Sequence, residues 1–150
     1  MISVFDDRIC ELGESPLWHP ERQELVWVDM FGKKLMTKSQ AWQFDVFVSA
    51  LGWIDRTRIL LATENELMTF DLETSDQTHV VALEADIPTN RSNDGRADPW
   101  GGFWISTMGK KNEPNVGAIY RFYKGELRQM FSELTIPNSI CFHPSAPLAL

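Results

Sequence analysis

A repeat of short apolar segments, separated by turns, constrains the fold of this chain more than any other feature. The turn that follows the first strand of each round recurs at Pro20, Arg56, Pro99 and Pro144, so successive rounds are 36, 43 and 45 residues apart. Each round is built from short strand-like segments rich in β-branched and aromatic residues, with no helix between them. Four short strands per unit, at a spacing of about 40–45 residues, are typical of the blade of a β-propeller.

The boundaries of the expected strands follow from the apolar runs and the turn residues between them. We predict strands over 25–30, 34–38, 43–48, 50–54, 59–63, 67–72, 78–83, 103–107, 117–123 and 127–131, with extended pieces at 2–5 and 96–98 and a fourth round opening at 136–144. The chain is therefore expected to be all-β: about three and a half propeller blades of four-stranded antiparallel sheet. They would form a single incomplete domain over residues 1–150. A β-sandwich is the alternative fold.

The stretch over residues 90–108 begins with turn-forming polar residues and ends as an aromatic strand. We expect a loop over 90–95 that holds Arg91, Asn93 and Asp94 on a rigid sheet, because binding groups are often placed on such loops. An ordinary solvated turn is the competing interpretation.

Three polar residues occupy matching places in successive rounds. Glu14, Asn93 and Asn138 each lie just before, or at the start of, the first strand of a round. In a propeller these strands converge on the axis, so residues far apart in the sequence meet at one point. Carboxylate and amide oxygens suit Ca²⁺ or Mg²⁺, and Zn²⁺ and Mn²⁺ also accept oxygen. A cap or turn role for each residue alone is the alternative.

The composition excludes some classes of protein. The net charge is −7 and the basic residues are scattered, which disfavours nucleic-acid binding. No run of about 18 apolar residues is present to span a membrane. The first ten residues lack the pattern of a secretory signal, so a cytoplasmic protein is expected. Cys10 and Cys141 are accordingly expected to be reduced thiols.

Five short motifs occur in order along the chain. They are Gly-Glu-Ser-Pro-Leu-Trp from Gly13, Asn-Asp-Gly-Arg-Ala-Asp-Pro from Asn93, Thr-Met at Thr107, Gly-Ala-Ile-Tyr from Gly117 and Pro-Asn-Ser from Pro137. Together they resemble the senescence-marker-protein/gluconolactonase/luciferin-regenerating-enzyme-like family, the family of regucalcin-like proteins, over nearly the whole chain.

The resemblance implies a six-bladed propeller that hydrolyses sugar lactones, such as gluconolactone, around one divalent cation. By motif position, Glu14 and Asn138 match cation ligands, and Arg91 and Asn93 match groups that contact the substrate. A cation polarises the lactone carbonyl and activates water, and an arginine can donate to sugar hydroxyls. The alternative function is a non-catalytic, regucalcin-like calcium-binding protein.

The chain departs from the family pattern in two places. The family's third ligand, an Asp that also serves as acid or base, is expected beyond Leu150, so no catalytic residue is assigned. Some members carry a substrate-contacting Glu three residues after Met108, where this chain has Lys111. We therefore expect the N-terminal half of a lactonase, weakly active or inactive alone, whose open propeller edges allow self-association.

Overall fold

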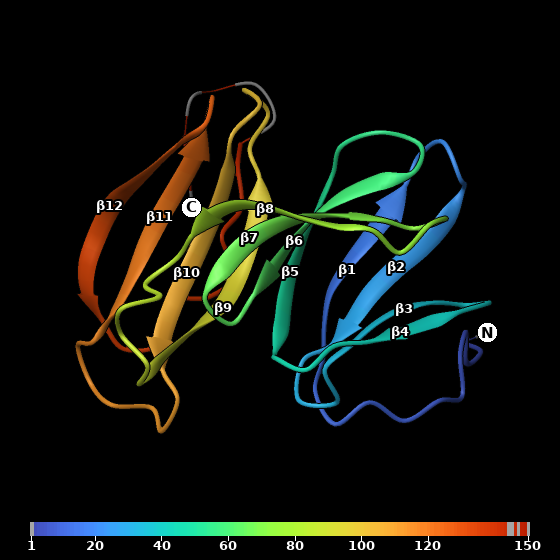
Figure 1. Ribbon diagram of the computed structural model, residues 1–150, viewed down its shortest axis with the longest axis horizontal. Helices are drawn as coiled ribbons and strands as arrows, with labels where there is room; N and C mark the ends of the chain where they lie inside the picture. The colour runs from blue at the N-terminus through green and yellow to red at the C-terminus, as the bar shows by residue number, and fades with distance from the viewer. Residues whose placement is uncertain (1, 144–145, 147, 150) are drawn as a thin grey trace.

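The computed structural model describes residues 2–143, 146, 148 and 149, and the described residues fold into three four-stranded sheets (Figure 1). The first sheet contains β1 (Gly13–His19), β2 (Glu24–Asp29), β3 (Lys34–Thr37) and β4 (Ala41–Gln43). The second contains β5 (Val48–Trp53), β6 (Arg58–Thr63), β7 (Glu66–Asp71) and β8 (Gln77–Ala82). The third contains β9 (Asn90–Ala97), β10 (Phe103–Gly109), β11 (Gly117–Tyr123) and β12 (Glu126–Leu134). In each sheet the strands pair antiparallel in sequence order.

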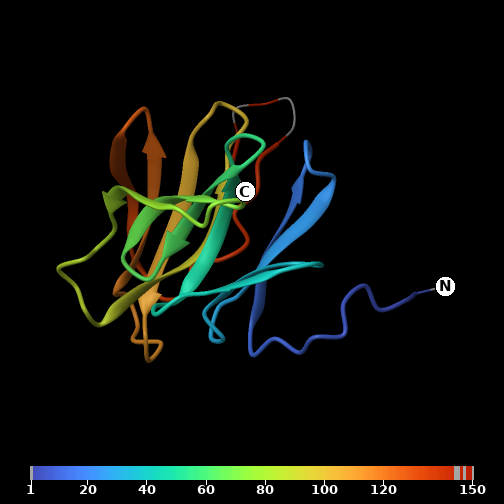
Figure 2. The same cartoon turned by 45° about the vertical axis from the view of Figure 1, so that its right-hand side comes forward.

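The three sheets stand side by side like blades, with the second between the other two (Figures 1 and 2). The first strands of the sheets are neighbours, because β5 contacts both β1 and β9. These three strands therefore form the inner edge of the assembly, which is the arrangement expected around a propeller axis.

Both faces of the middle sheet are buried. Ile59 and Leu61 of β6 belong to an apolar cluster that includes Val26 and Val28 of the first sheet. The alternate residue, Leu60, belongs to a second cluster with Phe103 and Ile105 of the third sheet. Alternation along a strand sends successive side chains to opposite faces, so the near-continuous apolar runs in the sequence reflect burial on both sides.

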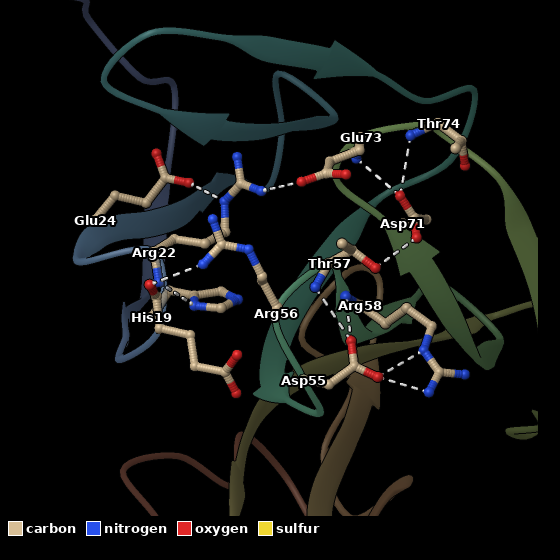
Figure 3. A network of polar contacts seen from close by, with 11 residues as sticks. His19, Arg22, Glu24, Asp55, Arg56, Thr57, Arg58, Asp71, Glu73 and Thr74 are labelled. Atoms are coloured by element: carbon tan, nitrogen blue, oxygen red, sulfur yellow. Dashed lines mark hydrogen bonds and ion pairs between the residues drawn. The ribbon is translucent and has the colours of Figure 1, made fainter.

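Polar contacts at the turns also join the first sheet to the second (Figure 3). Arg22 binds Glu24 at 2.5 Å within its own sheet and Glu73 at 3.2 Å in the second sheet. Trp42 of β4 donates its indole N–H to the Ser75 hydroxyl at 3.1 Å. These contacts join the β1–β2 turn and β4 of the first sheet to the β7–β8 turn of the second.

The structure corrects the expected loop over residues 90–95. This segment is the inner strand β9, which pairs with β10 through Asn90 opposite Gly109, Arg91 opposite Met108 and Ser92 opposite Thr107. Asn, Asp and Gly have low intrinsic preference for strands, but pairing with β10 and packing against β5 outweigh that preference here.

Two smaller expectations are also wrong. The predicted strand over 43–48 is split, because β4 ends at Gln43 and β5 begins at Val48, with Phe44 buried between them. Residues 2–5 form no strand. In the fourth round only an isolated bridge between Phe142 and Ala149 is found among the described residues, and Pro144 lies outside them.

Among the described residues, no helix is long and apolar enough to cross a membrane.

Candidate functional site

Each of the three inner strands contains one extra residue relative to its partner strand. The register shifts between Glu14 and Leu17 of β1, between Val48 and Ala50 of β5, and between Ser92 and Gly95 of β9. A β-bulge of this kind bends the strand and redirects a side chain. By register, Glu14 of β1, Val48 of β5 and Ser92 of β9 are the last paired residues before each bulge, and Ser49 and Asn93 lie within the bulges of β5 and β9.

A cavity of about 450 Å³ lies against these inner strands. Glu14 of β1, Asp94 of β9 and Asn138 contribute polar side chains to its wall, and Leu51 of β5 and Trp18 contribute apolar ones. Glu14 and Asn138 are far apart in the sequence, yet they line one cavity. The structure therefore brings together the two residues that the sequence predicts as cation ligands.

A left-handed serine follows each of these two residues. Ser15 has φ of 49° and Ser139 has φ of 60°, a region that non-glycine residues seldom occupy. The hydroxyl of Ser15 accepts a hydrogen bond from the Leu51 amide at 3.0 Å, which ties β1 to β5. Strained backbone of this kind is concentrated at binding sites, and here it follows both predicted cation ligands.

Arg91 is buried, with 7% of its surface exposed, and it does not line this cavity. Its Nη1 atom donates to the carbonyl of Ser92 at 2.9 Å and to Oδ1 of Asn93 at 3.0 Å, and it lies 3.2 Å from Sδ of Met30. No ion pair joins Arg91 to a carboxylate in the part of the chain that the structure describes. A buried guanidinium without a paired carboxylate is costly to maintain, and it favours an anionic or strongly polar ligand.

Burial lowers the pKa of Arg91. The negative charges of Glu64 and Glu14 act in the opposite direction and raise it. Arginine remains charged in proteins, so the guanidinium is a permanent positive charge near Glu14. Glu64 itself forms an ion pair with Lys110 at the end of β10.

Asn93 does not line the cavity, and its amide is occupied within the protein. Oδ1 accepts from Arg91, and Nδ2 donates to the carbonyl of Pro137 at 3.0 Å. Asn93 therefore links Arg91 to the segment that carries Asn138. Lys111 is exposed, and its amide donates to the Glu113 carboxylate at 2.9 Å.

Two more residues shape this site: Asp94, which the sequence suggested only as a candidate binding group of the expected loop, and Ser106, to which it assigned no role. Asp94 lines the cavity and accepts a hydrogen bond from the Ser139 amide at 2.6 Å. The hydroxyl of Ser106, fully buried on β10, lies 2.9 Å from the carbonyl oxygen of Asp94 and 3.0 Å from that of Pro137, so these two acceptors share its single proton. The recurring serine after Glu14 and Asn138 was a sequence signal for this geometry, but contacts between segments about 30–45 positions apart are not visible without the fold.

The donor set fits a hard divalent cation. Glu14, Asp94 and Asn138 offer carboxylate and amide oxygens to the cavity, which are the ligands that Ca²⁺, Mg²⁺ and Mn²⁺ prefer. No group of three or more His, Cys, Asp or Glu side chains is arranged to hold a metal ion among the described residues. A cation in this cavity would accordingly need the Asn138 amide, and water or further protein groups, to complete its shell.

Comparison with known proteins places this geometry in a family. Residues 12–148 match the model of the SMP-30/Gluconolactonase/LRE-like region. A protein of Rhizobium meliloti (strain 1021), provisionally named a sugar lactone lactonase, is 37% identical over 152 residues, which cover 97% of this chain and 51% of that protein. Regucalcin of Oryctolagus cuniculus is 26% identical over 143 residues, which cover 87% of this chain and 48% of that protein.

Solved structures agree with this assignment. Regucalcin of Agrobacterium tumefaciens, a calcium-binding protein, superposes with a TM-score of 0.89 at 36% identity, over 93% of this chain and 49% of that one. Luciferin-regenerating enzyme superposes with a TM-score of 0.81 at 25% identity, over 87% and 48%. The chain thus spans about half the length of the relatives it matches. These neighbours confirm the propeller prediction, and the chain belongs to the SMP-30/gluconolactonase/LRE-like family.

Proposed function

We propose that this chain carries part of the active site of a divalent-cation-dependent sugar-lactone hydrolase, with gluconolactone as the test substrate. One observation above all supports the proposal: Glu14 and Asn138 line the same cavity on the inner edge of the sheets, each followed by a left-handed serine. The names of the relatives, which include lactonases, agree with it.

In this proposal Glu14 and Asn138 hold the cation through their side-chain oxygens. When bound, a divalent cation stabilises the negative charge that develops on the lactone carbonyl oxygen and promotes ionisation of water. Ser15 and Ser139 are held by hydrogen bonds with Leu51 and Asp94, so the backbone next to both proposed ligands is fixed before any ligand arrives. Such preorganisation lowers the cost of assembling the site.

Arg91 is proposed to contact the substrate. Only its Nη1 atom has protein acceptors among the described residues, so Nε and Nη2 remain to donate to sugar hydroxyls or to the carboxylate that ring opening produces. Asn93 holds the guanidinium in place through Oδ1. The proposed role of Asn93 is therefore to orient Arg91.

No general base is assigned within the described residues. The family resemblance implies an Asp that serves as third ligand and as acid or base, in the half of the relatives that this chain does not span. We therefore expect weak or absent lactone hydrolysis by this chain alone, together with measurable cation binding.

A Mn²⁺ titration, followed by the electron paramagnetic resonance signal of free Mn²⁺, tests the site directly. Acid release from gluconolactone at constant pH is measured on the same samples. We expect Glu14→Gln and Asn138→Ala to lower Mn²⁺ affinity by about tenfold or more, because the first removes the carboxylate charge and the second removes the amide oxygen. Glu126→Gln, an exposed carboxylate on β12, is the matched control and should leave affinity unchanged. Equal Mn²⁺ binding by all these variants would refute the site.

The second candidate function is cation binding without catalysis. It is favoured by the absence of an assigned base in the described residues, and the regucalcin neighbour is a calcium-binding protein. Mn²⁺ or Ca²⁺ binding that depends on Glu14, with no hydrolysis above the uncatalysed rate, would support it. Hydrolysis that Glu14→Gln abolishes would instead show that this chain suffices for catalysis.

Self-association is a further part of the proposal. Several large apolar side chains are exposed on the outer two sheets and on the segment after them, among them Trp18, Trp100, Phe131 and Ile136. Exposed apolar surface and open sheet edges favour association with another chain. Sedimentation that shows only monomer at micromolar concentration would remove this proposal.

A further inference from the structure

The segment that carries Asn138 has no strand to hold it in place. Residues 135–141 are outside the sheets, and the nearest regular pairing is the isolated bridge between Phe142 and Ala149. Asn138 nevertheless lines the cavity with Glu14. The position of its side chain must therefore depend on contacts other than a ladder of backbone hydrogen bonds.

Those contacts come from β9 and β10. The carbonyl of Pro137 accepts from Asn93 Nδ2 and from Ser106 Oγ, both at 3.0 Å. The amide of Ser139 donates to Asp94 Oδ2 at 2.6 Å. Residues on both sides of Asn138 are thus fixed to the third sheet, and the contact with Asp94 is the one that involves a charged group. Hydrogen bonds to an ionised carboxylate are shorter and stronger than neutral ones.

Asp94 is itself held firmly. Its backbone N–H donates to Ser106 Oγ at 3.0 Å, and its carbonyl accepts from the same hydroxyl at 2.9 Å. The residue lies in the bulge of β9, where the register against β10 shifts. A buried serine on β10 therefore fixes the backbone of Asp94, and the bulge directs its carboxylate toward the segment that carries Asn138.

The amide of Ser139 is shared between two acceptors. It donates to Asp94 Oδ2 at 2.6 Å and to Oδ1 of Asn138 at 2.9 Å. The two side-chain oxygens consequently converge on one N–H group. Because Ser139 is left-handed, with φ of 60°, loss of the Asp94 contact would allow this residue to relax and the Asn138 side chain to turn.

We propose that Asp94 is a positioning residue for the cation site: through the Ser139 amide, its carboxylate holds the Asn138 side chain toward the cavity shared with Glu14. The expected effect on cation binding rests on the proposed function, since Asn138 is a ligand only in that proposal. The contact itself, between Asp94 and the Ser139 amide, is a property of the chain without a cation.

The first test measures Mn²⁺ affinity in a set of variants of the full chain. Asp94→Ala should lower the affinity by about 10–100-fold, the range found when a residue that orients a metal ligand is removed. Asp94→Asn, whose amide oxygen can still accept from Ser139, should stay closer to the parent chain than to Asp94→Ala. Asp7→Ala removes an exposed carboxylate from the N-terminal segment and should leave the affinity unchanged.

A double-mutant cycle separates positioning from direct ligation. If Asp94 acts through Asn138, then Asp94→Ala should have no further effect on Mn²⁺ affinity in an Asn138→Ala background. Two results would overturn the proposal: an undiminished effect of Asp94→Ala in that background, or an Asp94→Asn variant as weak as Asp94→Ala. Either would show that the carboxylate charge contacts the cation itself.

The second test needs no cation. Hydrogen exchange and the chemical shift of the Ser139 amide are followed by nuclear magnetic resonance in the metal-free chain. Asp94→Ala should accelerate the exchange and move the amide proton upfield, and Asp94→Asn should do so less. An unchanged amide in Asp94→Ala would overturn the positioning role. A parent chain that binds no Mn²⁺ but shows the amide effects would refute the proposed function and leave the Asp94 contact established.

Discussion

We predict that the stability of the loop between β9 and β10 depends on one buried carboxylate. The side chain of Asp98 is 0% exposed and forms an ion pair with Arg121 at 2.6 Å. Its Oδ1 also accepts from the amides of Trp100 and Gly102, at 2.9 and 2.7 Å, and its Oδ2 accepts from the indole of Trp104 at 3.0 Å. Four donors from β10, β11 and the connecting loop therefore converge on one carboxylate.

Removal of this carboxylate leaves all four donors without their acceptor. Breaking a buried ion pair by removing one partner costs about 3–5 kcal/mol, so we expect Asp98→Ala to lower the free energy of unfolding by that amount. A chain of this size loses roughly 2–4 °C of Tm per kcal/mol, which predicts a fall of about 10 °C. Asp98→Asn should recover only part of the loss. Its amide oxygen can accept from two of the donors, but its NH₂ group then faces the other two.

The effect should depend on pH in a defined direction. Burial alone would raise the pKa of Asp98, but the hydrogen bonds from Arg121, Gly102 and Trp104 outweigh it and hold the pKa below the ordinary value of 3.8. A group with a lowered pKa in the folded state contributes stability at pH values above 3.8, and this contribution is lost as the pH falls through the folded-state pKa. The difference in stability between the parent chain and Asp98→Asn should therefore shrink in acid.

Urea unfolding followed by tryptophan fluorescence, at pH 7 and at a series of acidic pH values, measures both effects. Asp55→Asn is the matched control, because Asp55 binds Arg58 at the same 2.6 Å distance but both side chains are exposed. An exposed pair contributes at most about 1 kcal/mol. A loss of less than about 1 kcal/mol in Asp98→Ala, or a difference that does not shrink in acid, would refute the reasoning.

Three further predictions concern β9 and its surroundings. Arg91→Met should change the free energy of unfolding by less than about 1 kcal/mol, because a buried cation without an ion pair contributes little net stability; a loss of about 3 kcal/mol or more in urea unfolding would contradict this. Gly95→Ala should destabilise the chain by about 1–3 kcal/mol, since its Cβ would lie 2.6 Å from the carbonyl oxygen of Trp104; an unchanged unfolding midpoint would show that β9 can move. Tyr120→Phe should cost about 1.5–3 kcal/mol in the same assay, because it removes the 2.8 Å hydrogen bond to the Glu84 carboxylate, and a neutral result would mean that this bond is replaced by water.

The sequence predicted the overall architecture correctly, but it predicted the inner strands less well. The repeat of apolar runs located β2, β6 and β10, which are largely buried; β2 and β6 are rich in Val, Leu and Ile, and β10 opens with Phe103, Trp104 and Ile105. It failed at β9, where Asn90, Ser92 and Asp94 resemble a turn, because the inner strand of a blade faces a polar axis and is held by neighbouring strands. Local preference describes a residue and its close neighbours in sequence, whereas this strand is defined by pairing with β10.

The same limit applies to the candidate site. Matching positions in the repeat grouped Glu14, Asn93 and Asn138; Glu14 and Asn138 line one cavity, and Asn93 does not. The roles of Arg91 and Asn93 as substrate contacts remain predictions from family resemblance. The contacts of Asp94 and Ser106 with residues 137–139 could not be predicted, because they join residues that are 31 and 45 positions apart through side chains rather than through a repeated pattern.

The bulge shared by β1, β5 and β9 has a consequence for how such a chain can acquire new chemistry. The extra residue in each inner strand is absorbed locally, so regular pairing of that strand with its neighbour resumes beyond it. The bulges carry or adjoin the polar residues Glu14, Ser49 and Asn93, none of which belongs to the apolar clusters between the blades. We expect the amino-acid differences that change substrate or ion preference to occur at these positions, while the residues that pack the blades together stay the same.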